Sequence, residues 1–362
     1  MHTGAMFGDM HPSSQDPRTR QEPPVDMSCN FAPTVATPDH IALAEELGYE
    51  RAFVFDSPAL YADVAATVAL AAARTSRITL GIAVITPHLR HLVANATMIA
   101  HLATLAPGRI EIGVGTGFTS AALIGRHPSR WSEIEAYVTA LRELLAGREV
   151  EWEGSMVGLL HGPVSGIQVP VEVPIWIAAE GPMGWAAADR LGCGVIANPS
   201  HGFNAEHGGE HVVSLPQVAG GVIASNSGTV LDEGETVESP RVMAAAGPIA
   251  ALSFHFGNRG PLVGTPELEG YLAAVAEVDE NRRHLVLHRG HLMELNENDQ
   301  KFMTPDVVRR ASTTMNRKEW AEYLSKIEDA GAAGFLYNPA GPDIPRELAA
   351  MAEAAAMVPM SK

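Results

Sequence analysis

The chain has 362 residues, 46% of them hydrophobic, which suits one large α/β domain or two ordinary ones. Its 42 acidic and 25 basic residues give a formal net charge of −17, and this acidity argues against a nucleic-acid-binding surface, which needs basic patches. No apolar run approaches the roughly 20 residues of a membrane helix, and Cys29 and Cys193 form no metal-ligand pattern. We therefore expect a cytoplasmic protein without membrane or nucleic-acid partners.

The first 26 residues differ in composition from the rest. They are rich in Pro, Ser, Asp, Gln and Arg and lack the apolar segment of a secretory signal. Residues 1–26 are therefore predicted to form a flexible tail, with a lid or subunit contact as the alternative. Residues 27–362 are expected to form a single domain.

Strand and helix patterns alternate after the tail. The expected strands, in chain order, are 29–32, 51–55, 78–85, 109–114, 173–179, 194–197, 241–246 and 334–337. The expected helices are 38–47, 60–74, 91–105, 129–145, 183–191 and 344–357. The strands are apolar on both faces, which is typical of a parallel sheet. Eight such units predict an α/β (β/α)8 TIM barrel, with a doubly wound sheet as the alternative.

Three stretches do not fit a bare barrel and are predicted insertions after strands 4, 6 and 7. Residues 148–171 suggest a hairpin, and 201–240 are polar, Gly-rich and His-rich, as in a mobile loop. Residues 280–316 are charged and His-rich. Loops after barrel strands shape the active-site mouth, so the last two stretches are candidate lids, and ordinary surface loops are the alternative.

The third expected strand ends in a polar cluster, residues 86–91. A strand's C-terminal end is where barrel enzymes place catalytic groups. His88 and His91 are therefore candidate catalytic residues, as hydrogen-bond donors or as acid/base groups near neutral pH. In the alternative interpretation, Arg90 and His91 cap the next helix and contact neighbouring carboxylates.

The fourth strand runs into a glycine-rich turn at residues 109–118. Gly113, Gly115 and Gly117 alternate, so one backbone face lacks side chains and a ligand can approach it closely. A tight turn without a ligand is equally compatible with this motif, because a lone Gly-x-Gly is a weak signal.

Two later segments are candidate phosphate sites. Residues 178–183 end a strand, turn at Gly181 and start a helix at Pro182, where free amides suit a phosphate, although the charge of Glu180 opposes one. The last strand is followed by a Pro/Gly-rich segment over 338–342, which is either the usual barrel phosphate loop or a plain turn.

Histidines in the 280–316 stretch raise the question of a metal. His284, His288, His291 and Glu294 have spacings that share one helix face, but Gly290 interrupts that helix. We therefore expect no metal, and we expect the histidines to line the mouth of a pocket. The chain lacks hydrolase, P-loop and Rossmann motifs, and no Lys follows any expected strand, which counts against a Schiff-base aldolase.

Taken together, these segments resemble the bacterial luciferase-like family of flavin- and deazaflavin-dependent oxidoreductases, over about 28–357. The most specific match is 82–135, with Pro-His-Leu-Arg-His at 87–91, the glycine turn and the Arg-Trp-x-Glu-x-Glu sequence at 130–135. Further matches are 174–182 and 192–196. The subgroup that the chain looks most like is labelled methylenetetrahydromethanopterin-reductase-like.

The resemblance implies a flavin-type ring at the C-terminal mouth of the barrel. The cofactor-binding residues are then Thr86, Gly113, Gly115, Thr116, Gly117, Ala179, Glu180, Gly181, Pro182 and Met183. The expected substrate pocket comprises Asp56, Phe118, His255, His288 and His291. Phe118 stands where some deazaflavin enzymes carry an acid, and this departure favours FMN.

The expected function is an oxidoreductase that uses reduced FMN as a monooxygenase on a small carbonyl or alkene-like substrate. A flavin reductase would then supply the reduced cofactor, and the family usually forms homodimers, with residues 129–145 as one candidate contact. Hydride transfer with coenzyme F420 is the first alternative, and a non-catalytic flavin-binding partner subunit is the second. A barrel isomerase or aldolase is the unrelated possibility.

Overall fold

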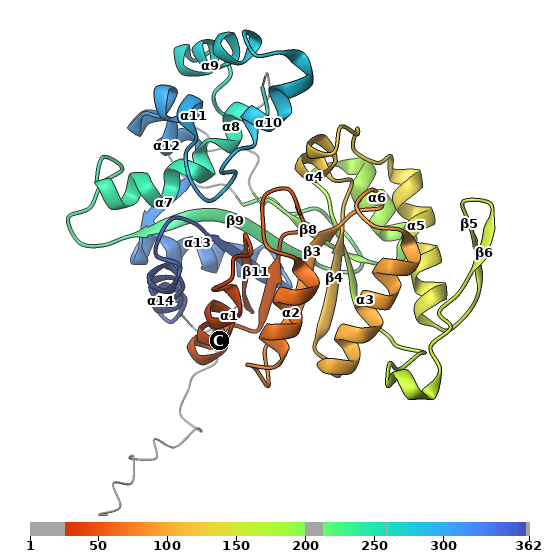
Figure 1. Cartoon of the computed structure of the whole chain (residues 1–362). Coiled ribbons are helices and arrows are strands. Elements are labelled where there is room, and N and C mark those ends of the chain that lie inside the picture. Colours follow the sequence, from red (N-terminus) through yellow and green to blue (C-terminus); the bar gives the residue numbers. More distant parts are fainter. Residues whose placement is uncertain (1–25, 200–212, 258–259, 360–362) are drawn as a thin grey trace, which may run out of the picture.

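A computed structural model describes residues 26–199, 213–257 and 260–359 (Figure 1). The tail expected over 1–26 lies outside the described residues except for Asp26, as does most of the first half of the loop expected over 201–240. In the described part of the chain, no helix is both long and apolar enough to cross a membrane.

Eight parallel strands close into a barrel, which confirms the fold expected from the sequence. They are β1 (Met27–Phe31), β2 (Arg51–Val54), β3 (Thr79–Ile85), β4 (Ile110–Val114), β7 (Ile175–Ala178), β8 (Gly194–Ala197), β9 (Val222–Leu231) and β11 (Gly334–Pro339). The barrel closes because β9 pairs with both β8 and β11, and β11 pairs with β1. A ninth strand, β10 (Thr313–Asn316), pairs in parallel with the outer half of β9.

Helices cover the outside of the barrel (Figure 1). They are α1 (Thr37–Leu47), α2 (Val64–Ala72), α3 (Leu92–Leu105), α5 (Trp131–Leu145), α6 (Pro182–Leu191), α13 (Arg317–Asp329) and α14 (Ile344–Ala355). A small cluster that includes Phe53, Ile223 and Leu336 fills the barrel interior, and a larger apolar layer lies between strands and helices. Burial of these two layers supplies the main drive for folding.

The hairpin expected within 148–171 is confirmed as β5 (Val150–Trp152) paired with β6 (Ser155–Val157). The strand expected over 241–246 is wrong, because these residues lie in the helix α7 (Pro240–Ala250). Ser239 and Pro240, at the N-cap and first turn, favour a helix start and outweigh the short apolar run that suggested a strand. The seventh barrel strand is β9, within the stretch expected to be a loop.

The insertion between β9 and β11 forms a separate helical layer beside the mouth of the barrel (Figure 1). It comprises α7 followed by α8 (Leu252–His255), α9 (Pro266–Ala276), α10 (Arg283–Leu287), α11 (Glu297–Phe302) and α12 (Pro305–Ala311). Its own apolar cluster includes Phe254, Leu268 and Tyr271. The irregular stretch expected over 280–316 is therefore part of a larger insertion that begins after β9.

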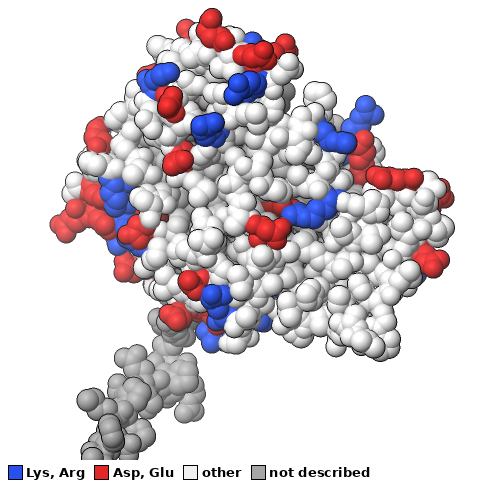
Figure 2. Space-filling view, in the orientation of Figure 1, with Lys and Arg blue, Asp and Glu red and all other residues white. Residues whose placement is uncertain are grey.

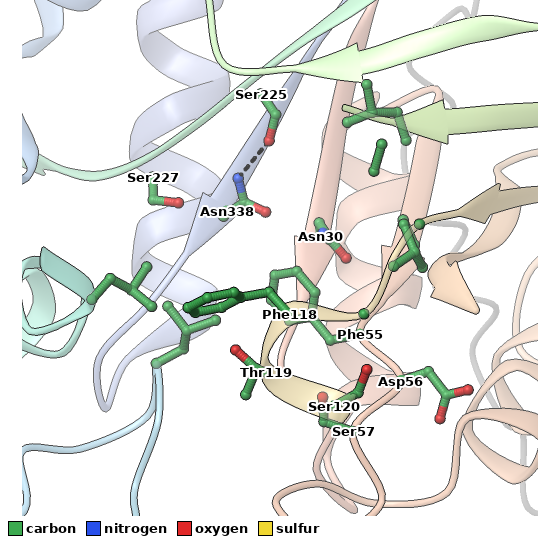
Figure 3. A pocket seen from close by; sticks show the side chains of 18 of the residues that line it. Asn30, Phe55, Asp56, Ser57, Phe118, Thr119, Ser120, Ser225, Ser227 and Asn338 are labelled. Atoms are coloured by element: carbon green, nitrogen blue, oxygen red, sulfur yellow. Dashed lines mark hydrogen bonds between the residues drawn. The ribbon is translucent and has the colours of Figure 1, made fainter. Parts of the chain in front are cut away.

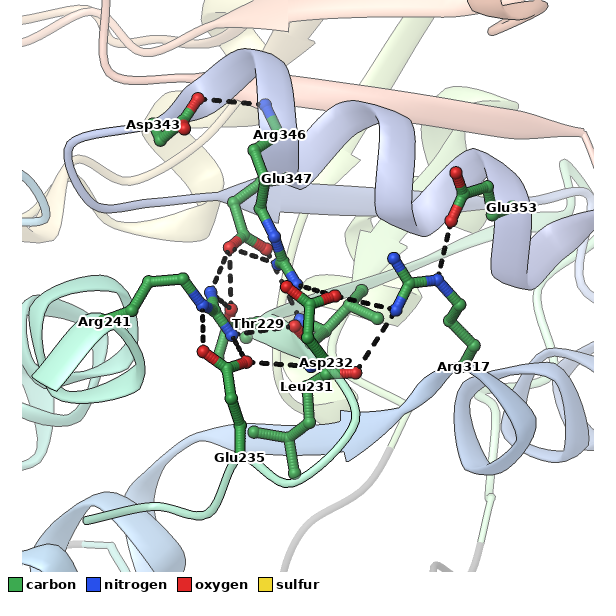
Figure 4. Close-up of polar contacts among 12 residues, drawn as sticks. Thr229, Leu231, Asp232, Glu235, Arg241, Arg317, Asp343, Arg346, Glu347 and Glu353 are labelled. Atoms are coloured by element: carbon green, nitrogen blue, oxygen red, sulfur yellow. Dashed lines mark hydrogen bonds and ion pairs between the residues drawn. The ribbon is translucent and has the colours of Figure 1, made fainter. Parts of the chain in front are cut away.

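A buried ionic network joins α14 to β9 and α7 (Figure 4). The Glu347 side chain is only 2% exposed and accepts hydrogen bonds from Thr229 Oγ1 at 2.7 Å and Arg241 Nη1 at 2.9 Å. Arg346 Nη1 and the Tyr337 hydroxyl lie 2.8 and 2.9 Å from the same carboxylate. These contacts satisfy a charge that would be costly to bury alone.

Candidate functional site

A cavity of about 420 Å³ lies at the C-terminal ends of the barrel strands (Figure 3). Every barrel strand, or the residues directly after it, contributes to its wall, from Asn30 of β1 to Asn338 of β11. The volume is that of a typical small-molecule site, and this end of a barrel is where active sites lie. We therefore take the cavity as the candidate active site.

The glycine-rich turn after β4 lines the cavity with Gly115, Thr116 and Gly117. These glycines are also needed for packing, because a Cβ at Gly115 would lie 2.9 Å from a methyl group of Val84 in β3. Gly117 has a φ of +82°, and its Cβ would lie 2.9 Å from a methyl group of Thr86. The turn therefore combines both interpretations of the motif: it is a tight turn, and its backbone forms a cavity wall.

Asp56, directly after β2, lines the cavity and is buried. Its Oδ2 receives a charge-assisted hydrogen bond from Arg90, which also lies 3.7 Å from Asp63. Burial raises the pKa of Asp56, although the Arg90 guanidinium acts in the opposite direction. Asp56 Oδ1 and Asn30 Oδ1 are buried without a hydrogen-bond partner in the described chain, on two residues that line the cavity.

The opposite wall carries hydroxyl and amide groups from β9 and β11 (Figure 3). Asn338 donates to Ser225 Oγ at 3.0 Å and to the Asn226 carbonyl at 2.9 Å, and Ser227 also lines the cavity. Sequence reasoning missed Ser225 and Ser227 because β9 was not recognised as a strand, whereas Asn338 begins the segment 338–342 that was a candidate phosphate loop. The polar Ser-Asn-Ser run between apolar residues of 222–231 was the available signal.

The insertion closes one side of the cavity with His291. Its Nε2 lies 3.4 Å from Thr119 Oγ1, and its carbonyl accepts a hydrogen bond of 2.8 Å from the Tyr61 hydroxyl. Phe118, half-exposed at the cavity wall, packs against Phe256 with ring centroids 5.6 Å apart. The structure thus brings three predicted substrate-pocket residues to the cavity: Asp56, Phe118 and His291.

The other two predicted pocket residues, His255 and His288, lie behind His291 and are not among the residues that line the cavity. His255 Nδ1 is 3.1 Å and His288 Nδ1 is 3.4 Å from His291 Nδ1. Burial first, and then the neighbouring histidines, lower the pKa of His288 to about 4 and that of His291 to about 2. Both imidazoles are therefore neutral near pH 7.

The candidate catalytic histidines make contacts away from the cavity. His88 Nε2 lies 2.9 Å from Ser129 Oγ, and the Ser129 amide donates to the Thr116 carbonyl, so His88 supports the glycine-rich turn from behind. His91 is the N-cap of α3 and accepts from the Val93 amide. The alternative interpretation of this segment therefore holds for Arg90, which contacts carboxylates, and for His91, which caps the helix.

The remaining predicted cofactor residues fall into two groups. Six of them are not among the residues that line the cavity: Thr86, Gly113, Ala179, Gly181, Pro182 and Met183. Glu180 does line it, and its carboxylate accepts from the Asn198 amide at 3.1–3.2 Å. This contact holds the end of β7 to the segment after β8. Gly181 is the N-cap of α6, so a phosphate at this position stays a prediction.

Comparison with known proteins identifies the family. The model for luciferase-like monooxygenases matches residues 6–221, more than half of the chain. The chain belongs to the luciferase-like monooxygenase family. The cavity therefore lies in a family barrel, at the mouth where the resemblance placed the cofactor.

Relatives and solved structures with different cofactors resemble the chain. An F420-dependent glucose-6-phosphate dehydrogenase of Microbacterium testaceum is 32% identical over 171 residues, which are 44% of this chain and 51% of the relative. The chain thus matches about half the length of its curated relatives. The F420-dependent tetrahydromethanopterin reductase of Methanopyrus kandleri has the same fold, with a TM-score of 0.65, 18% identity, and coverage of 91% of this chain and 97% of that one.

A monooxygenase also shares the fold. The oxygenating constituent of 3,6-diketocamphane monooxygenase from Pseudomonas putida, in complex with FMN, has a TM-score of 0.58 and 14% identity, covering 93% of this chain and all of that one. Identities this low establish the barrel alone. The choice between the two cofactors therefore depends on the relatives of higher identity and on the cavity.

Proposed function

We propose that the protein is a coenzyme F420-dependent oxidoreductase that interconverts a small alcohol and its carbonyl compound. The F420-dependent dehydrogenase relative at 32% identity favours this reading over the FMN monooxygenase expected from Phe118. Two buried oxygens, Asn30 Oδ1 and Asp56 Oδ1, lack partners in the described chain and are candidate acceptors for a cofactor N–H group or a substrate hydroxyl.

The proposed reaction depends mainly on Asp56. When an alcohol becomes a carbonyl compound, its carbon loses a hydride and its oxygen loses a proton, so the reaction needs a hydride acceptor and a base. A bound deazaflavin supplies the hydride chemistry. We assign the proton to Asp56, because this residue lines the cavity, its Oδ1 has no partner in the described chain, and Arg90 fixes the other carboxylate oxygen.

The chemistry of the wall also favours an uncharged substrate. Among the described residues that line the cavity, none is Lys or Arg. Ser57, Thr119, Ser225 and Asn338 instead offer hydroxyl and amide groups. The relative is named for a phosphorylated sugar, and a phosphate needs cations or a row of free amides. A neutral alcohol needs only hydroxyl and amide groups.

Anaerobic titration with F420 and with FMN tests the cofactor. We expect F420 to bind at least about tenfold more tightly, which is about 1.4 kcal/mol, and to be reduced only when a secondary alcohol is present. Tighter binding of FMN, with substrate-dependent oxygen uptake after its reduction, would favour the monooxygenase and a flavin reductase partner. Tight binding of either cofactor without substrate-dependent change would point to a non-catalytic partner subunit.

We also propose that the protein is a homodimer that pairs through α2 and α3. Neither helix contains Lys, Arg, Asp or Glu, and the face over them is nearly free of charge (Figure 2). Leu70 and Leu105 are each about half exposed there. The helix first considered, α5, instead holds charged side chains in ion pairs, such as Glu135 with Arg190. Uncharged surface with exposed leucines is typical of an interface core.

Sedimentation velocity tests this interface. We expect the wild-type protein to sediment as a dimer and the double variant Leu70→Glu/Leu105→Glu as a monomer, because the new carboxylates would have to be buried without partners. Leu160→Glu is the matched control and should stay dimeric, because Leu160 follows the hairpin of β5 and β6 and is 89% exposed. A dimeric double variant would show that the contact lies elsewhere.

A further inference from the structure

Three histidines from two segments of the long insertion meet beside the cavity. His255 ends α8, and His288 and His291 follow α10. The side chain of His255 is 2% exposed, and His288 and His291 are also buried. Their ligand atoms all lie within 4.8 Å of one another. The expectation of no metal considered only spacings within one helix, and it grouped His255 with His288 and His291 only as expected substrate-pocket residues.

Two of the three distances between the nitrogens fit a metal centre. Zn–N bonds of about 2.0–2.1 Å at tetrahedral angles put neighbouring nitrogens about 3.3–3.4 Å apart. His291 Nδ1 lies 3.1 Å from His255 Nδ1 and 3.4 Å from His288 Nδ1. We propose that the three Nδ1 atoms bind one divalent transition-metal ion, with Zn²⁺ as the preferred ion and the fourth position left to water.

The outer nitrogens support this arrangement. If each Nδ1 binds the metal, each Nε2 carries the proton. His255 Nε2 then points its N–H toward Asp299 Oδ1, 3.7 Å away, and His291 Nε2 can donate to Thr119 Oγ1 at 3.4 Å. A carboxylate or hydroxyl behind a metal-bound imidazole is the usual way in which proteins fix its tautomer and orientation.

The hydrogen bonding within the cluster agrees with the geometry. Without a metal, His255 and His288 both crowd the single Nδ1 of His291, which can accept only one strong hydrogen bond. With a metal, all three lone pairs have a partner, and the nearby Asp299 carboxylate offsets part of the added charge.

Binding of the metal would fix one part of the cavity wall. His291 lines the cavity, and the metal would join its segment to the end of α8. The ion would therefore stabilise the insertion against the barrel mouth and hold His291 in place. The metal would bind whichever cofactor the barrel holds, because two of its three ligands, His255 and His288, are not among the residues that line the cavity.

Cobalt titration of the full chain, purified without a histidine tag and treated with a chelator, tests the site. We expect one Co²⁺ per chain, with the intense visible absorption of four-coordinate cobalt, and its displacement by one equivalent of Zn²⁺. Absence of stoichiometric binding, or only the weak absorption of six-coordinate cobalt, would overturn the proposal. Because this measurement uses the unmodified protein, it does not depend on the folding of any variant.

Variants then assign the ligands. His255→Gln and His288→Gln should each weaken cobalt binding by about tenfold or more, and Asp299→Asn should weaken it by about 10–100-fold. His284→Gln, in the same segment but outside the cluster, and His127→Gln, at an exposed position, are the controls and should bind as the wild type does. Unchanged binding in both His255→Gln and His288→Gln, with folding verified by circular dichroism, would refute the assignment.

Discussion

Replacing Asp56 with asparagine is expected to lower the turnover number of alcohol oxidation by about 10²–10⁴-fold, the usual contribution of a general base. The substitution keeps the size and most hydrogen bonds of the side chain but removes its ability to take a proton. Cofactor affinity, measured by anaerobic titration, should change much less, because the side chain keeps an oxygen acceptor at the cavity wall. Steady-state kinetics under anaerobic conditions provide the measurement.

The pH dependence distinguishes a base from a merely structural residue. Burial raises the pKa of Asp56, and a base acts in its ionised form. The rate should therefore rise with pH through this raised pKa and level off above it, and the Asn variant should lack that limb. Asp63→Asn is the matched control, since Asp63 also lies near Arg90 but is 59% exposed and does not line the cavity. An equal loss in both variants would mean that the Arg90 pairing, not proton transfer, matters.

The first six barrel strands were predictable from the sequence because each is a short apolar run followed by a turn. The expected strand over 194–197, for example, coincides with β8. The seventh strand was missed for a physical reason. Ser225 and Ser227 of β9 face the cavity and carry polar side chains, so the apolar pattern breaks where the strand builds the site. A strand that lines a polar pocket does not look like a buried strand.

The site was predictable only where it follows the ends of strands. The strand-end rule found Asp56 and the turn from Gly115 to Phe118, all of which line the cavity. The family resemblance assigned His255, His288 and His291 to one pocket, but the strand-end rule could not find their direct contacts, because His255 is more than 30 positions from the other two in an insertion without a repeating pattern. Such contacts are determined by how the helices of the insertion pack, and spacing along the chain does not encode them.

Replacing Glu347 with alanine is expected to lower the free energy of unfolding by about 3–5 kcal/mol, the usual effect of removing one partner from a buried ion pair. The carboxylate is 2% exposed, whereas its partners Arg241 and Arg346 are 28% and 19% exposed (Figure 4). Without Glu347, both guanidinium groups and the Thr229 hydroxyl lose an acceptor in a poorly hydrated place. Urea-induced unfolding measures the change.

Glu353→Ala on the same helix is the control for this effect. Glu353 is 61% exposed and pairs with Arg317, and a surface pair of this kind contributes about 0–1 kcal/mol. A similar small loss in Glu347→Ala would show that water replaces the buried carboxylate. A large loss would show that the network holds β9 in place, because Thr229 lies on that strand and Glu347 on α14. The strand that carries Ser225 and Ser227 to the cavity would then be held in position by the ion pair of Glu347 and Arg241, which contacts Thr229 and Val230 of that strand.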